Sequence, residues 1–161
     1  MNPFHSKKPM NTDYAKQHEQ NDFELFLQLG SKFKLRKLGR TPEKHDTDVS
    51  GYTQDDRYIE IELKRRYINV DTYPTIIIEP YKIQYANNHK DIIQLYVNFT
   101  NDDCAIVFNL HHITNPNKRE YDITSKLYER TKLSNRYELP IKQAWIYKKI
   151  NDKYKLIQKG W

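Results

Sequence analysis

The sequence predicts a single domain of the mixed α/β class. Three observations carry this prediction: a helix-like segment near the start, several short apolar runs separated by turn residues, and a second helix signal between two groups of such runs. Strand-like runs on both sides of a helix indicate a central sheet with helices packed against it. The 161 residues are enough for one domain with its own core.

The first predicted element is a helix over residues 13–29. Its apolar residues recur at intervals that place them near one face, and Gly30 follows as a fitting helix stop. Residues 1–12 are polar and contain two prolines, so we expect a flexible tail there and a domain that spans 13–161. A strand is expected next, over 32–38, because its residues alternate in character.

Residues 45–52 and 58–65 predict a β hairpin, because a cluster of turn residues separates two strand-like runs. After a short apolar run at 76–78, Pro80 begins a helix that should reach Asn88, since proline fits the first helical turn. The remaining predictions are a hairpin of 92–99 with 104–110, a short helix over 121–131, and a terminal hairpin of 144–150 with 153–159.

The charge balance favours a polyanionic partner. Lys and Arg number 27 against 21 Asp and Glu, which gives a formal charge of +6 and a pI near 9.2, and nucleic acid is the default partner of a basic domain. A single cysteine excludes a disulfide framework within the chain, and no apolar run is long enough to predict a membrane span. A cytoplasmic location is therefore expected, and the scarcity of glycine argues against a P-loop or dinucleotide-binding fold.

The segment 58–66 carries the candidate chemistry. In a strand alternate side chains share a face, so Glu60, Glu62 and Lys64 should project together, opposite the apolar residues between them. A hairpin turn centred on Asp55 pairs residues whose numbers sum to 110. That register places one further carboxylate, Asp48, directly opposite Glu62.

Two assignments in this cluster stay open. A different hairpin register would bring in Asp46 in place of Asp48. Glu60 is a third ligand, an outer carboxylate or a solvated neighbour of the cluster.

Two carboxylates and a lysine on one sheet face can cleave a phosphodiester. The carboxylates repel each other, and a divalent cation relieves this repulsion. Mg²⁺ takes oxygen ligands, acidifies water and stabilises charge on the phosphate, and a lysine beside it adds a fixed positive charge. The alternative to a catalytic site is an ordinary solvated face of Glu and Lys side chains, which is common on surface strands.

The stretch TDVSGYTQDDRYIEIELKRR, residues 47–66, resembles the core of the PD-(D/E)xK nuclease superfamily. The matching pattern is an Asp at the end of one strand, here Asp48, and an apolar-E-x-K run in the next, here Glu62 to Lys64. Thr47 stands where the motif's name has proline. The resemblance covers about residues 13–110. It implies a restriction-endonuclease-like fold with an αβββαβ core and a mixed central sheet flanked by helices. The C-terminal β hairpin predicted above would be an extension of this fold.

The resemblance also implies roles for individual residues. Asp48 and Glu62 would ligate Mg²⁺ or Mn²⁺, and Lys64 would assist the attacking water. Members similar to Holliday-junction resolvases carry a further Glu on the first helix, for which Glu19 matches best by spacing and Glu24 second. The residues expected to contact DNA are Arg65 and Arg66, which follow the motif, and Lys82 and Gln84 on the next helix.

We therefore interpret the sequence as a metal-dependent deoxyribonuclease. Heavy use of Lys, Asn, Ile and Tyr is typical of AT-rich genomes and indicates a phage origin, with the host cytoplasm as the location. One alternative is a DNA-binding protein that keeps the nuclease fold without catalysis; another is a phage protein-interaction module that acts on a host factor. A homodimer would suit an enzyme that cuts both strands. The sequence leaves open duplex, branched or single-stranded substrates, DNA or RNA, and endo- or exonuclease action.

Overall fold

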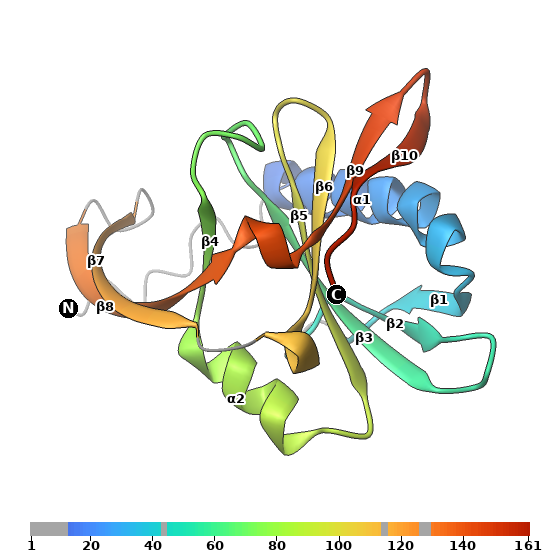
Figure 1. The fold of residues 1–161 in the computed structure, drawn as a ribbon, viewed down its shortest axis with the longest axis horizontal. Helices are drawn as coiled ribbons and strands as arrows, with labels where there is room; N and C mark the ends of the chain where they lie inside the picture. Colours follow the sequence, from blue (N-terminus) through green and yellow to red (C-terminus); the bar gives the residue numbers. More distant parts are fainter. Residues whose placement is uncertain (1–12, 43–44, 114–115, 126–129) are drawn as a thin grey trace.

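The computed structural model describes residues 13–42, 45–113, 116–125 and 130–161, so the predicted tail over 1–12 lies outside it. The first half of the chain contains the expected αβββαβ order, with β4 as an additional strand before the second helix (Figure 1). In sequence, these elements are α1 (Asp13–Gly30), β1 (Arg36–Arg40), β2 (Val49–Tyr52), β3 (Tyr58–Arg65), β4 (Thr75–Ile78), α2 (Pro80–Asn88) and β5 (Ile93–Phe99). The second half contributes β6 (Cys104–Asn109), β7 (Asn117–Ser125), β8 (Arg130–Pro140), β9 (Trp145–Ile150) and β10 (Lys153–Gln158).

Seven strands form the central sheet, in the order β1-β2-β3-β5-β6-β9-β10. Neighbouring strands are antiparallel except for β3 and β5, which are parallel, so the sheet is mixed as predicted. The terminal hairpin is also confirmed: Asn151 and Asp152 both have positive φ, as a tight hairpin turn requires. This hairpin extends the central sheet beyond β6 rather than standing apart from it.

A second, antiparallel sheet has the order β4-β8-β7. The short helix predicted over residues 121–131 is therefore wrong, because the described residues of that stretch belong to β7 and β8. A short segment without clear periodicity does not distinguish helix from strand. Here the long antiparallel pairing of β7 with β8 satisfies the main-chain hydrogen bonds, and the segment therefore forms strands rather than a helix.

The strand predicted over residues 32–38 is shorter and lies later in the chain. Residues Ser31–Phe33 form a 3₁₀ turn, and β1 runs on to Arg40. Lys34 and Lys37 both have a φ of 53°, which a continuous strand does not allow. The register with β2 shifts between Arg36 and Gly39, so Lys37 sits in a β-bulge.

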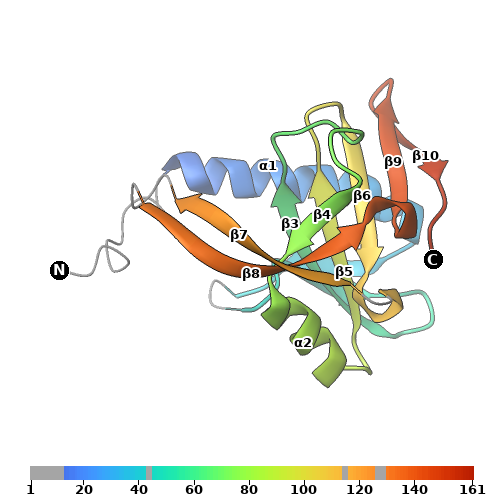
Figure 2. The same ribbon diagram turned by 60° about the vertical axis from the view of Figure 1, so that its left-hand side comes forward.

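Helix α1 covers one face of the central sheet, whereas α2 and the second sheet lie on the other (Figures 1 and 2). On the α1 side, Phe26 and Leu29 pack with Ile59 and Ile61 of β3. On the α2 side, a second apolar cluster joins the two sheets around Tyr96. Strand β3 is therefore covered on both faces, and the face that carries Glu60 and Glu62 lies under α2.

Candidate active site

The register of the β2–β3 hairpin brings Asp48 next to Glu62. Paired residues have numbers that sum to 110, beginning with Val49 opposite Ile61, as the sequence predicted. Asp48 directly precedes that pair. Its main-chain nitrogen donates to the carbonyl oxygen of Ile61 at 3.0 Å, and its Oδ2 accepts from the main-chain nitrogen of Leu63 at 2.7 Å. Asp48 is thus tied to β3 on both sides of Glu62.

Glu62 is buried, with 8% of its surface exposed, and two lysines reach it. Nζ of Lys82 donates a hydrogen bond to Oε1 of Glu62, and Nζ of Lys64 lies 3.5 Å from the same oxygen. Burial raises the pKa of Glu62, and the negative charge of Asp48 raises it further, while the two lysines lower it; the net pKa lies above the ordinary value. Asp48 and Glu62 are therefore close enough to repel each other.

Lys82, on α2, was itself predicted to contact DNA, but the structure directs it to Glu62 instead. Its side chain is only 8% exposed, and its ammonium group is bound to Glu62. Burial lowers the pKa of Lys82, but the charge and the hydrogen bond of Glu62 outweigh this, so the pKa lies above its usual value. Lys82 is therefore charged at neutral pH, and it directs that charge at Glu62.

Glu79 also belongs to this cluster, although no role was predicted for it from the sequence. It stands in extended conformation directly before Pro80, at the start of α2. Burial raises the pKa of Glu79, but a main-chain hydrogen bond and the positive charges of Lys64 and Lys82 bring it below the ordinary value. The positive charges of the two lysines thus act on both Glu62 and Glu79. The signal in the sequence was weak: an acidic residue next to a helix start is also common for purely local reasons.

Glu60 is buried rather than solvated, which corrects one of the alternatives left open. It is 2% exposed, and its Oε2 accepts hydrogen bonds from the hydroxyl of Tyr85 at 3.1 Å and from Nε2 of Gln94 at 3.0 Å. Nε2 of His45 lies 3.5 Å from its other oxygen. Burial and the bond to Glu60 raise the pKa of Tyr85 to about 12. Glu60 therefore anchors α2 to β3 beside the candidate site.

Of the two carboxylates considered on the first helix, Glu19 lies on the side of Asp48. Glu19 and Asp48 both line a small hollow between α1 and the sheet. Oε2 of Glu19 accepts from Nη2 of Arg40 at 3.1 Å, so Glu19 is paired with a cation there. Glu24 instead accepts a hydrogen bond from Gln20 on the exposed side of the helix, and it does not line the hollow.

The carboxylate oxygens of Asp48 and Glu62 suit a hard divalent cation that keeps several bound waters and also binds a phosphate of the substrate. Within residues 13–42, 45–113, 116–125 and 130–161, no group of three or more His, Cys, Asp or Glu side chains is gathered as for a metal ion. Asp48 and Glu62 nevertheless form a repelling pair, with Asp48 exposed. Mg²⁺ is commonly held by one or two carboxylates plus substrate phosphates. Asp46 lines a separate small hollow together with Glu62, so it remains an alternative ligand.

Arg65, which was predicted to contact DNA, points toward α1. Its Nη2 donates to Oδ1 of Asp22, and its guanidinium lies 5.7 Å from the centre of the Phe99 ring. Gln84, another predicted contact, is exposed on α2. Its side chain is therefore available to a ligand, whereas that of Arg65 is partly used to hold α1.

Arg66 links β3, β4 and β5. Its Nε donates to Oδ1 of Asn98 at 2.8 Å, and its Nη2 donates to the carbonyl oxygen of Ile77 at 2.8 Å and to the hydroxyl of Tyr96. The Nη1 atom has no partner among the described residues. Arg66 is thus fixed in place by the protein and keeps donors for a further acceptor.

No protein-family model matches the chain, and no curated protein sequence matches it. Among solved structures, it is similar to Hjc, a Holliday junction resolvase from the hyperthermophilic archaeon Archaeoglobus fulgidus. The TM-score is 0.48 and the sequence identity 10%, over 76% of this chain and 84% of that chain. Likeness at this level assigns neither a family nor an activity. In the described part of the chain, no helix combines the length and apolar character that a membrane crossing requires.

Proposed function

We propose that this chain is a nuclease that hydrolyses DNA phosphodiester bonds with Mg²⁺ or Mn²⁺. The observation that carries the proposal is the meeting of Asp48, Glu62 and Lys64 at the point where the β2–β3 ladder ends. Carboxylates that repel each other beside a lysine are costly for the fold. Such a cost is typical of a site that acts on a charged ligand.

Asp48 and Glu62 would hold the cation. The exposed carboxylate of Asp48 uses Oδ2 to accept from the backbone of β3 and so presents Oδ1 in a fixed direction. Glu62 offers Oε2, because its Oε1 faces the two lysines. The cation, when bound, would acidify water and stabilise negative charge on the phosphate.

Lys64 and Lys82 would have different tasks. The side chain of Lys64 is 37% exposed, so its ammonium group can contact both Glu62 and a phosphate oxygen or the attacking water. Lys82 is buried and would act as a positioning residue, which keeps Glu62 ionised and oriented. Of the two lysines around Glu62, Lys64 would thus contact the substrate and Lys82 would hold Glu62 in place.

The net charge of +6 supports a polyanionic substrate. One observation favours a second candidate, a DNA-binding protein without catalysis. The charge of Glu62 is already balanced by two lysines, and no third metal-ligating side chain joins it among the described residues. The nuclease candidate predicts cleavage that requires a metal ion and Glu62, whereas the second candidate predicts DNA binding without cleavage.

The deciding experiment is cleavage of supercoiled plasmid and of a four-way junction with Mg²⁺, Mn²⁺ or EDTA. Wild type is compared with Glu62→Gln and Lys64→Ala, and Glu24→Gln is the matched control because Glu24 lies outside the cluster. We expect metal-dependent cleavage that falls on the order of a hundredfold in Glu62→Gln and in Lys64→Ala but not in the control. Metal-independent DNA binding without cleavage by any form would replace the enzyme with the second candidate.

A further inference from the structure

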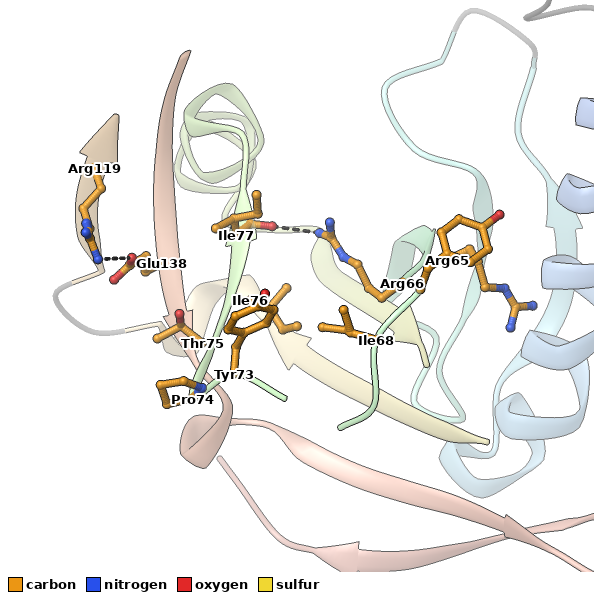
Figure 3. Close-up of a pocket in the computed structure, with 11 residues that line it drawn as sticks. Arg65, Arg66, Ile68, Tyr73, Pro74, Thr75, Ile76, Ile77, Arg119 and Glu138 are labelled. Carbon is orange, nitrogen blue, oxygen red and sulfur yellow. Dashed lines mark hydrogen bonds and ion pairs between the residues drawn. The ribbon is translucent and has the colours of Figure 1, made fainter. Parts of the chain in front are cut away.

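A cavity of about 650 Å³ lies where β3 ends (Figure 3). Its walls come from the end of β3, the loop that follows, strand β4, and residues of β7 and β8. Small-molecule sites have volumes of roughly 300–1,000 Å³, so a nucleotide-sized group fits here. The proposed active site, which consists of Asp48, Glu62 and Lys64, does not use this space.

The lining combines an apolar floor with exposed aromatic rings. Ile68, Pro74 and Ile76 supply aliphatic surface. Tyr67 and Tyr73 border the same cavity and are 71% and 57% exposed. Aromatic rings at the mouth of an apolar cavity provide flat surfaces on which a planar ligand can stack.

Hydrogen-bonding groups stand on two sides of the cavity. Arg66 is held on Ile77, as Figure 3 shows, and its Nη1 lacks a partner among the described residues. Across from it, Nη1 of Arg119 lies 3.1 Å from Oε1 of Glu138. A base presents both donors and acceptors along its edge, and such fixed groups can contact them.

Two strands connect the cavity to the candidate site. Arg66 directly follows the end of β3 and comes two residues after Lys64, which in an extended chain is a distance of about 7 Å. Ile77 of β4 lies in the cavity wall and precedes Glu79 by two residues, and the positive charge of Lys64 lowers the pKa of Glu79. A DNA strand with a phosphate at Lys64 would therefore have a neighbouring nucleotide at the cavity.

We propose that this cavity binds an unpaired base of the DNA substrate. The inference rests on the proposed function and names its substrate class: DNA that contains single-stranded nucleotides, such as a flap, a gap or a branch. Taking a base out of a continuous duplex requires that it be unpaired and unstacked, whereas an unpaired base is available without that cost. The cavity therefore selects against continuous duplex.

The test measures binding in EDTA, so that it does not depend on cleavage. The full chain is titrated with a fluorescent oligothymidylate, with an abasic strand of the same length, and with a blunt duplex. We expect the oligothymidylate to bind more tightly than the other two. Tyr73→Ala should weaken that binding about tenfold and leave duplex binding unchanged, because each stacked base contributes at this scale.

Matched variants distinguish stacking from a change in folding. Tyr73→Phe retains the ring and should bind like wild type. Tyr52→Ala removes an exposed tyrosine from β2, away from the cavity, and should have no effect. A 2-aminopurine base within the single strand should change its fluorescence on binding wild type but not Tyr73→Ala.

Two results would overturn the inference: equal binding of the abasic and the base-carrying strand, or an unchanged preference in Tyr73→Ala. Metal-dependent plasmid cleavage together with either result would leave the proposed function intact. A preference for unpaired bases without cleavage by any form would instead overturn the nuclease activity alone.

Discussion

The side chains of Lys82 and Glu62 form a buried ion pair that joins α2 to β3. The pair matters because Glu62 also lies within range of the negative charge of Asp48. Without a cation beside it, a buried carboxylate that faces another carboxylate would favour its neutral form. Lys82 thus supports the ionised state that a metal ligand needs.

We expect Lys82→Met to lower the stability of the protein by about 2–4 kcal/mol, since it leaves Glu62 buried beside Asp48 with only Lys64 near it. Urea unfolding in EDTA measures this change. Lys90→Met, at an exposed position after α2, is the control and should have little effect. In the double variant Glu62→Gln with Lys82→Met, part of the loss should be recovered, because no unpaired charge remains. Strictly additive losses would show that the two side chains do not interact.

The raised pKa of Glu62 predicts a particular pH dependence. Because the folded state binds this proton more tightly than the unfolded chain does, the contribution of Glu62 to stability is complete below its unfolded pKa of about 4.5. It is lost as the pH rises through the higher folded pKa. The stability of wild type relative to Glu62→Gln should therefore fall with rising pH across this interval. Urea unfolding at a series of pH values measures it, and a difference that grows with pH would contradict the sign.

Lys82→Met should also move the titration of Glu62 to higher pH, because Lys82 lowers the pKa of that carboxyl group. A ¹³C NMR titration of the glutamate side chains in EDTA reads this directly, with Glu62→Gln to assign the signal. If the midpoint stayed in place, the charge of Lys82 would not reach Glu62.

The two carboxylates considered on α1 can be separated by metal affinity. Glu19 shares a hollow with Asp48, whereas Glu24 does not. We expect Glu19→Gln to raise the Mn²⁺ concentration needed for half-maximal cleavage several-fold and Glu24→Gln to leave it unchanged. Isothermal titration with Mn²⁺ alone provides a second measurement that does not depend on catalysis. Equal behaviour of the two variants would restrict Glu19 to its ion pair with Arg40.

The hairpin that carries Asp48 and Glu62 could be predicted because its register depends on local information. A short polar turn fixes which residues face each other, and alternation then fixes the shared face. The second helix was equally predictable, since Pro80 marks its start. The residues that form the motif could therefore be placed relative to one another before the fold was known.

The packing of α2 over Glu60 and Glu62 could not be predicted in the same way. That Lys82 reaches back to Glu62, and Tyr85 to Glu60, depends on how α2 packs across the sheet. No local pattern encodes that packing, and a lysine on a helix is normally exposed. The pairing of β7 with β8 is likewise a contact between segments, and it overrode the helix predicted there.

Arg66 provides the sharpest contrast between a predicted DNA contact and a structural role. Its guanidinium donates to Asn98, to the carbonyl of Ile77 and to the hydroxyl of Tyr96, which is fully buried. We expect Arg66→Met to cost about 2–3 kcal/mol of stability, because these buried acceptors lose their partner. Urea unfolding measures the cost, and Arg57→Met, at an exposed turn position, is the control.

The same variant tests the predicted DNA contact through the salt dependence of duplex binding. A side chain that neutralises a phosphate contributes about one unit to the slope of log K against log salt. Because Nε and Nη2 of Arg66 are bound to β4 and β5 and the remaining Nη1 is assigned to the cavity rather than to a backbone phosphate, the slope for duplex DNA should be unchanged in Arg66→Met. A slope reduced by about one unit, with stability intact, would return Arg66 to the DNA-binding surface.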